Sequence, residues 1–273
     1  MKHLLLISNI SKSNSQLLSY AAAFCKYYNC KLHLLHISEN SEPILISSPY
    51  YYTQNNLEWT QQIENKLMKS LVQEVSEILN TEMVHSKIVL GNKEEVLKNF
   101  INENFIDLII VGSPDLEKKS EFLDHKNILI NTIDTPLLVI PEFKIFEPLL
   151  SFNFLTSNSE KDIEDIILLS KLFVASNIVL THFANGKASL KTRQNNWKSF
   201  VNDKVPGRIE HNTINEDIGT YISQENLGLE NVSQAFVFTT KKRNFWSRII
   251  DPSTTLGYLA GLEIPSIIFK TSA

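Results

Sequence analysis

The residues best suited to chemistry lie near the carboxyl end of the chain, where basic side chains precede a serine at a predicted helix start. The basic residues are Lys241, Lys242, Arg243 and Arg248, and Ser253 follows them. Cationic side chains and backbone N–H groups at a helix N-terminus both attract phosphate, so this segment could cradle an anion. The alternative is a solvated loop whose aromatic side chains cover the end of a sheet, and we favour that alternative.

The spacing of the histidines and cysteines along the chain does not predict a metal site. His33 and His36 are three residues apart on a predicted strand, so they point to opposite faces and cannot chelate one ion together. His36 recurs as His182 in the second half, and we interpret both as core or strand-end residues. Cys25 and Cys30 are the only cysteines, and without a second pair we expect buried, reduced thiols.

The sequence contains no recognisable catalytic constellation. It has no paired carboxylates, nucleophile elbow, Walker loop or zinc-type spacing. We therefore expect that the protein is not an enzyme. Three consecutive tyrosines at 50–52 lie in a long loop after the second predicted strand, where they either cap the crevice at the strand ends or pack against a neighbouring helix or subunit.

The composition of the chain excludes some classes of binding partner. The chain has 273 residues, 43% of them hydrophobic and 21% charged, which suits two soluble globular domains. A net charge of -4 gives no general attraction to nucleic acid or to an anionic membrane. No apolar run approaches the roughly 20 residues that span a bilayer, and the opening MKHLLLISNISKS does not have the pattern of a signal peptide. We expect a cytoplasmic protein with neither a nucleic-acid nor a membrane partner.

Short apolar runs alternate with helical patterns in the first half. We predict strands at 3–8, 31–37, 83–90, 107–113 and 136–140, and helices at 12–28, 57–80, 94–104 and 120–133. In the longest helix the residues at helical spacing are Ile63, Leu67, Leu71, Val75 and Ile78. Strands separated by helices pair in parallel through right-handed crossovers. The pattern predicts a doubly wound α/β domain with a five-stranded parallel sheet and helices on both faces.

The second half repeats this plan, which indicates a duplication. Its opening strand places Asn153 where Asn9 lies in the first half. Two later segments match as well: AFVFTT (235–240) matches DLIIVGS (107–113), and IPSIIFK (264–270) matches TPLLVIP (135–141). We predict two tandem domains, at 1–142 and 146–273.

The closing segments of both halves resemble the universal stress protein family. In that family an apolar strand, a glycine-containing loop, a helix and a proline-led strand end the domain, as DLIIVGS…IDTPLLVIPE does in this chain. The resemblance covers nearly the whole chain in two copies and implies a tandem member with the adenine nucleotide alpha-hydrolase-like fold. Members of the family that bind ATP carry G-x2-G-x9-G-[S/T] after the fourth strand and usually an Asp that closes the first strand.

In the second half the register of this motif is intact, but its chemistry is lost. Counting from Thr239 puts Lys242 and Pro252 at the second and third glycines and Ser253 at the hydroxyl position. All three glycines are therefore replaced, and Asn153 stands in place of the Asp. Lys242 could neutralise an anion, but its side chain obstructs the close backbone approach that glycine allows.

In the first half a single glycine of the motif remains. Gly112 is retained, whereas counting back from Pro136 puts Leu123 and Asp124 at the final Gly-Ser position of a loop that is two residues too short. The Asp124 carboxylate would repel a phosphate, and Asn9 again replaces the Asp. We expect no ATP in this half.

The sequence thus predicts a non-catalytic stress-response or regulatory module with degenerate nucleotide sites, no cofactor and little or no ATP binding. Two alternatives stay open: weak ATP or AMP binding by the second half, and a scaffold for an unknown protein partner. The candidate nucleotide- or anion-binding residues are Asn9, Gly112, Ser113, Asn153, Thr239, Thr240, Lys242 and Ser253.

The last strands of the two halves suggest how the halves associate. The segments 136–140 and 265–269 are apolar, and each is predicted to be the outermost strand of its sheet. An exposed apolar edge invites pairing, and antiparallel contact between these two strands would satisfy both. We expect intramolecular pairing of the two domains, with a homodimer of the whole chain as a further partner.

Overall fold

The computed structural model divides into two compact units. The N-terminal unit is Lys2–Ile110, and the C-terminal unit comprises Met1 and Val111–Ala273. The residues that the structure describes are 1–7, 15–38, 53–112, 133–141, 144–156, 160–174, 176–183, 197–199, 201–205, 208–215, 218–227, 234–241 and 262–271. The helix predicted at 120–133 and the tyrosines at 50–52 therefore lie outside the described residues, apart from residue 133.

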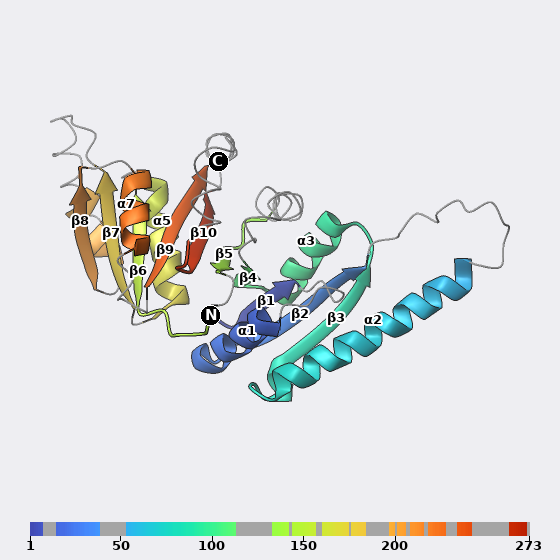
Figure 1. The fold of residues 1–273 in the computed structure, drawn as a ribbon. Coiled ribbons are helices and arrows are strands. Elements are labelled where there is room, and N and C mark those ends of the chain that lie inside the picture. Colours follow the sequence, from blue (N-terminus) through green and yellow to red (C-terminus); the bar gives the residue numbers. More distant parts are fainter. Residues whose placement is uncertain are drawn as a thin grey trace. The chain divides into compact units, whose positions relative to one another are not determined.

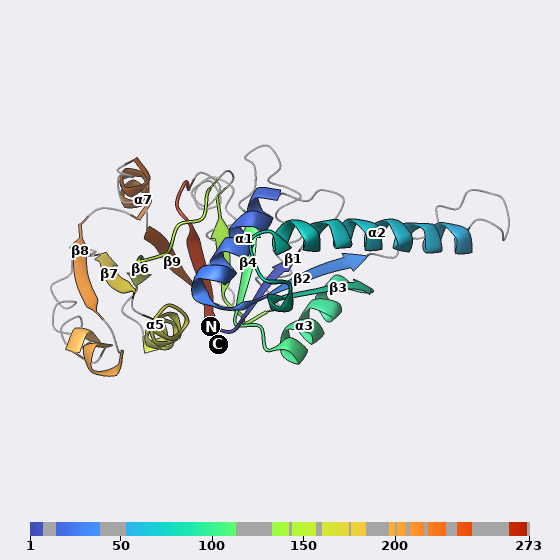
Figure 2. The ribbon, with the colours of Figure 1, turned by 90° about the horizontal axis from the view of Figure 1, so that it is seen from below.

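Four parallel strands form the sheet of the N-terminal unit, in the order β3-β2-β1-β4 (Figure 1). In chain order the elements are β1 (His3–Ile7), α1 (Ser15–Tyr28), β2 (Lys31–Ser38), α2 (Thr53–Ser76), the 3-10 turn Thr81–Met83, β3 (Val84–Leu90), α3 (Lys93–Asn104) and β4 (Leu108–Gly112). The central strands are apolar throughout because helices cover both faces: Leu5 and Ile109 are 0% exposed, and α2 and α3 lie on opposite sides of the strands in Figure 2.

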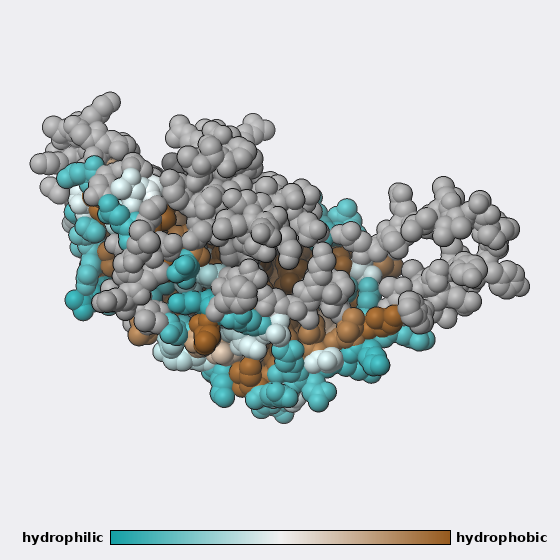
Figure 3. Space-filling view, viewed as in Figure 1, coloured by the Kyte–Doolittle hydropathy of each residue, from teal (hydrophilic) through white to brown (hydrophobic). Residues whose placement is uncertain are grey.

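Helix α2 buries a stripe that differs in part from the predicted one. Met68, Leu71 and Val75 are buried, whereas Ile63 and Leu67 are each 38% exposed. Brown apolar side chains accordingly appear on the surface along α2 in Figure 3. A spacing of four residues advances about 40° beyond a full helical turn, so the residues of such a series rotate away from the sheet. None of the described helices is both long and apolar enough to cross a membrane.

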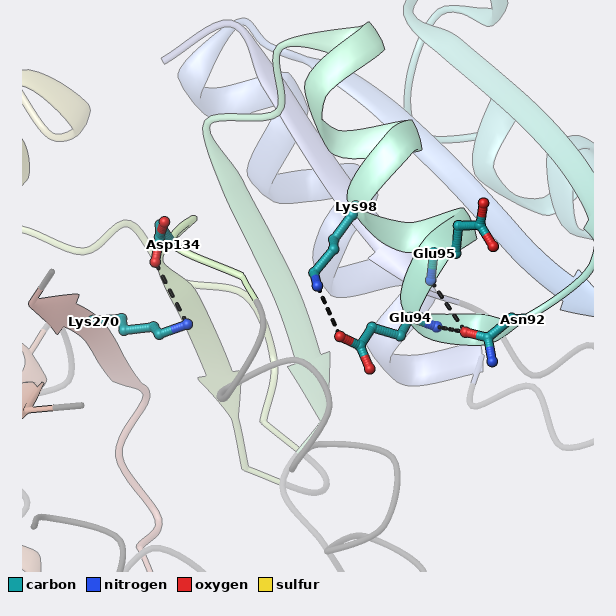
Figure 4. Close-up of polar contacts among 6 residues, drawn as sticks. All are labelled: Asn92, Glu94, Glu95, Lys98, Asp134 and Lys270. Carbon is teal, nitrogen blue, oxygen red and sulfur yellow. Dashed lines mark hydrogen bonds and ion pairs between the residues drawn. The ribbon is translucent and has the colours of Figure 1, made fainter. Parts of the chain in front are cut away.

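Helix α3 has a well-defined beginning and end. The side chain of Asn92 accepts hydrogen bonds from the N–H groups of Glu94 and Glu95, at 3.0 and 3.2 Å, and so caps the first turn (Figure 4). Lys98 pairs with Glu94 at 2.8 Å, one turn further on. The helix ends at Phe105, whose φ of 50° places a bulky residue in the left-handed region.

Five parallel strands form the larger part of the sheet in the C-terminal unit, in the order β8-β7-β6-β9-β10. In chain order the elements of this unit are β5 (Leu137–Ile140), β6 (Ser151–Thr156), α5 (Glu160–Leu172), β7 (Asn177–Phe183), β8 (Ile209–Ile214), α7 (Ile218–Leu227), β9 (Gln234–Lys241) and β10 (Ser266–Thr271). Helices α5 and α7 lie on opposite sides of β6, as Figure 2 shows.

The two units repeat one topology. The order β3-β2-β1-β4 recurs as β8-β7-β6-β9, so a first strand at the centre pairs with the second and fourth strands of each repeat. The predicted α/β class with parallel strands and helices on both faces is confirmed. Strands β2 and β7 are counterparts, and the match of His36 with His182 aligns His33 with Val179.

The antiparallel contact expected between the two closing segments is present. Strand β5 pairs with β10 through Leu138 and Ile267, which are both 0% exposed. Beside this pair, Lys270 Nζ lies 3.5 Å from a carboxylate oxygen of Asp134 (Figure 4). In the division given above, β5 falls in the C-terminal unit. The domain bounds of 1–142 and 146–273 stay a prediction.

Candidate functional site

The carboxyl ends of parallel strands are where doubly wound folds bind ligands, so the polar groups at these ends define the candidate site. In the C-terminal unit the sequence candidate Asn153 lies in the middle of β6, before that end, and is buried. Its side-chain nitrogen donates a 2.6 Å hydrogen bond to the hydroxyl of Tyr221 in α7, and its oxygen accepts one of 2.7 Å from the hydroxyl of Thr181 in β7. Both ends of the amide are therefore engaged by other elements of the protein.

A second group lies on the opposite face, where β6 meets α5. The hydroxyl of Thr156, the last residue of β6, donates a 2.7 Å hydrogen bond to Asp162, which is 0% exposed. Asp165, one turn further along α5, is also buried, and its Oδ2 makes no hydrogen bond. Burial, and then the charges of Asp162 and Glu164, raise the pKa of Asp165 to about 7. This strand end is acidic, which opposes an anionic ligand.

His182, the residue of β7 beside Thr156, belongs to the same group. Its Nε2 lies 3.2 Å from Nδ1 of His211 in β8, and the ring of Trp197 meets it edge-on with centroids 5.5 Å apart. Burial is the main cause that lowers the pKa of His182 to about 4, followed by the charges of Lys198 and His211. This histidine is neutral at physiological pH, and it is packed as the sequence interpretation proposed.

In the N-terminal unit the corresponding strand end holds His36, Ser38 and Glu64. The hydroxyl of Ser38 donates to Oε1 of Glu64 at 2.8 Å, and His36 Nε2 lies 3.4 Å from the same oxygen. The serine proton is thus directed to the carboxylate rather than to the imidazole, so the trio is not arranged as a Ser-His-acid relay. Sequence reasoning missed Ser38 and Glu64. A signal existed, because Glu64 lies four residues before buried Met68 on the sheet-facing stripe of α2.

The structure describes only some of the motif residues that were predicted from the sequence. Gly112 is the last residue of β4, and Thr239 lies in β9. Thr240 follows Thr239 in the same strand, paired with Lys270 of β10. The remaining candidates lie outside the described residues: Asn9, Ser113, Lys242 and Ser253, as do Leu123, Asp124 and Pro252.

The strand registers correct one expectation about Asn153. Asn153 pairs with Val179, and in the N-terminal unit it is Leu5 that pairs with His33, the counterpart of Val179. Asn153 is therefore the counterpart of Leu5, in the middle of the sheet, and not of Asn9. The apparent match arose because both asparagines follow short apolar runs, whereas the pairing partners fix the register.

His33 lies on the face opposite His36, as the strand spacing predicted. Its Nε2 is 2.9 Å from Nδ1 of His3, and its ring stacks on His85 with centroids 5.2 Å apart. Burial lowers the pKa of His33 to about 4, with the charges of His3, His85 and Lys31 as smaller causes. Within the described part of the chain, no group of three or more His, Cys, Asp or Glu side chains is arranged to hold a metal ion.

Comparisons with known proteins agree with this fold. The model of the universal stress protein family matches residues 1–141. A solved universal stress protein from Archaeoglobus fulgidus superposes with a TM-score of 0.65 at 10% identity, over 99% of this chain and 96% of that one. A putative universal stress protein from Pseudomonas aeruginosa gives 0.54 at 13% identity, over 99% and 93%.

The same fold occurs in a protein of another kind. The cytoplasmic domain of a prokaryotic cation chloride cotransporter superposes with a TM-score of 0.56 at 12% identity, over 99% of this chain and 96% of that chain. At such identities the structural likenesses show the fold alone. A search of curated proteins finds no match.

Proposed function

Because the chain belongs to the universal stress protein family, we propose that it is a tandem member acting as a non-catalytic stress-response or regulatory module with little or no affinity for ATP. The repeat of β3-β2-β1-β4 as β8-β7-β6-β9 supports the tandem arrangement. The contacts at the strand ends support the weak affinity for nucleotide.

The observation that carries the proposal is the buried carboxylate of Asp162 at the carboxyl end of β6. It is 0% exposed and holds the hydroxyl of Thr156, so this strand end presents a negative group from within the protein. A carboxylate in the protein interior repels a nearby anion more strongly than one in water does, because the effective dielectric constant is lower.

The candidate Asn153 lies in the middle of β6 and not at the carboxyl end, where a ribose or a base would bind. Asn153 is bonded to both Thr181 and Tyr221, so a ligand would have to break two internal hydrogen bonds to reach it. In addition, the glycines that would let backbone N–H groups approach phosphates are replaced by Thr239 and, in the segment after it, by Lys242 and Pro252. Each lost backbone contact to a charged phosphate costs on the order of 1.5–3 kcal/mol.

Isothermal titration of the full chain with Mg-ATP tests the proposal. We expect no saturable heat below millimolar nucleotide, and no release of phosphate above the background rate in a hydrolysis assay. A dissociation constant in the low micromolar range would show that the proposal is wrong. It would instead favour the alternative in which the second half binds ATP or AMP.

Substitutions in the two halves show which half is responsible for any weak nucleotide binding that is observed. Lys242→Glu should abolish it, whereas Ser113→Glu should leave it unchanged, because only the second half keeps a cation in the motif register. Asp162→Asn should strengthen binding of inorganic phosphate or ATP, and Glu164→Gln serves as its control, since Glu164 is exposed on the same helix. Equal effects of Asp162→Asn and Glu164→Gln would contradict a role for the buried carboxylate.

A further inference from the structure

Two cysteines of the N-terminal unit touch one another. The Sγ atoms of Cys25, in the last turn of α1, and Cys30, directly before β2, are 3.2 Å apart. Both thiols are free, and their residues are 0% and 1% exposed. The expected burial of both thiols is confirmed, but their mutual contact was not foreseen from the sequence.

The contact follows from how α1 ends. Asn29 adopts a φ of 50°, and the N–H of Cys30 donates a 3.0 Å hydrogen bond back to the carbonyl of Cys25. This six-residue closure is a Schellman motif, in which the side chains at the two ends of the hydrogen bond meet. The backbone at the end of α1 therefore brings the side chains of Cys25 and Cys30 together.

Helix α3 ends with the same motif and different side chains. Phe105 has a φ of 50°, and the N–H of Ile106 donates to the carbonyl of Ile101 at 3.2 Å. Ile101 and Ile106 thus occupy the places that Cys25 and Cys30 occupy at the end of α1. An aliphatic pair fills these positions in one helix, whereas a pair that can be oxidised fills them in the other.

We propose that Cys25 and Cys30 form a modification site, at which oxidation joins the two sulfur atoms in an intramolecular disulfide. A disulfide bond is about 2.05 Å long, so each sulfur atom would have to move only about 0.6 Å from its present position. The hydrogen bond between Cys30 and Cys25 already holds the two backbones at the ends of a short loop.

A peroxide supplies the oxidising equivalents. One thiol is oxidised by hydrogen peroxide to a sulfenic acid with release of one water, and the second thiol then displaces a second water to form the disulfide. Two thiols thus lose two protons and two electrons, and one peroxide is reduced to two waters. The same product arises when a small disulfide is reduced to its two thiols.

The rate of oxidation depends on how easily an oxidant reaches Cys25 and Cys30. The four residues between the cysteines form the surface of this corner, and Tyr27 among them is 53% exposed. The thiols therefore lie directly beneath a surface turn that a small oxidant can reach when the end of α1 frays. Burial raises the pKa of the Cys25 thiol well above its ordinary value, with the neighbouring Cys30 as a further cause, so oxidation is slow. The site responds to sustained oxidation rather than to a brief pulse.

Intact mass measurement tests the proposal on the folded full chain. After prolonged exposure to hydrogen peroxide, the protein is denatured and alkylated with a maleimide. We expect the wild-type chain to lose two hydrogen atoms, to take up no maleimide and to stay monomeric on a non-reducing gel. Treatment with a dithiol should restore two alkylation sites. Cys25→Ala and Cys30→Ala should each lack this product and fold normally, because alanine suits a small buried position.

A matched variant checks that the geometry of the helix end is the cause of disulfide formation. In a Cys25→Ala/Cys30→Ala background, Ile101→Cys/Ile106→Cys places thiols at the same two positions of the motif that ends α3, and it should form the intramolecular disulfide as well. The proposal is overturned if the folded wild-type chain keeps both thiols under conditions that oxidise the urea-unfolded chain. It is equally overturned if the products are sulfinic acids or disulfide-linked dimers.

Discussion

The hydroxyl of Thr181 donates a 2.7 Å hydrogen bond to the side-chain oxygen of Asn153, on the neighbouring strand. The nitrogen of the same amide donates to Tyr221, so one buried side chain ties β6 to β7 and to α7. An amide that is bonded at both its nitrogen and its oxygen ties these elements together and stabilises the fold.

Replacing Asn153 by leucine should lower the free energy of unfolding by about 1–3 kcal/mol, because two buried hydroxyl groups lose a hydrogen-bond partner. Urea denaturation followed by circular dichroism measures the change. The triple variant Asn153→Leu/Thr181→Val/Tyr221→Phe should recover part of the loss, since it removes the polar partners as well. A single variant as stable as the wild type would argue against this structural role.

Asp165 should make the protein less stable as the pH rises. Its pKa is raised from 3.8 to about 7, so its contribution to stability is complete below about pH 4 and is lost as the pH rises through 7. At about 1.4 kcal/mol for each pKa unit, the loss is on the order of 4 kcal/mol. Asp165→Asn should therefore be more stable than the wild type at about pH 8, by thermal or urea unfolding. Glu164→Gln, the exposed neighbour, should change little.

His33 and His182 should make the protein less stable as the pH falls. The pKa of each is lowered from 6.5 to about 4 in the folded state, so each contributes stability that is present above pH 6.5 and is lost as the pH falls through 4. Each histidine accounts for a loss of about 3 kcal/mol over that range. His33→Gln and His182→Gln should each flatten the acid limb of the stability curve. The two effects should add, because the residues belong to different units. An acid limb unchanged in the double variant would contradict the assignment.

Phe105 is a strained helix end that glycine should relieve. A phenylalanine with a φ of 50° and 80% exposure has little packing to offset its left-handed backbone. Phe105→Gly should raise the free energy of unfolding by about 1 kcal/mol, since glycine adopts this conformation without a steric penalty. Phe105→Ala is the control: it removes the ring but keeps the Cβ, so it should give no gain. Equal effects of the two substitutions would show that the ring, and not the backbone, matters.

Much of the fold could be predicted from local pattern. The apolar runs that became β1, β4 and β9 were recognisable because strands buried on both faces need apolar side chains throughout. The crossover rule then left few ways to order them. The antiparallel pairing of β5 with β10 was also expected, because each segment is an apolar edge that needs a partner. Local pattern was less reliable along α2, where only part of the predicted apolar series faces the sheet.

The sequence by itself determined the duplicated α/β plan and the separation of His33 from His36 on opposite faces. These features depend on periodicity and residue type, which are local properties of the chain. Only the tertiary structure decided that Asn153 lies at the level of Leu5, that Glu64 bonds to Ser38 and that Asp162 is fully buried beside Thr156. Asn153 and Tyr221, for example, are 68 residues apart, and such pairs meet only through the register of the strands and the docking of the helices. Periodicity states which face a residue lies on, whereas packing in three dimensions decides which residues of that face meet.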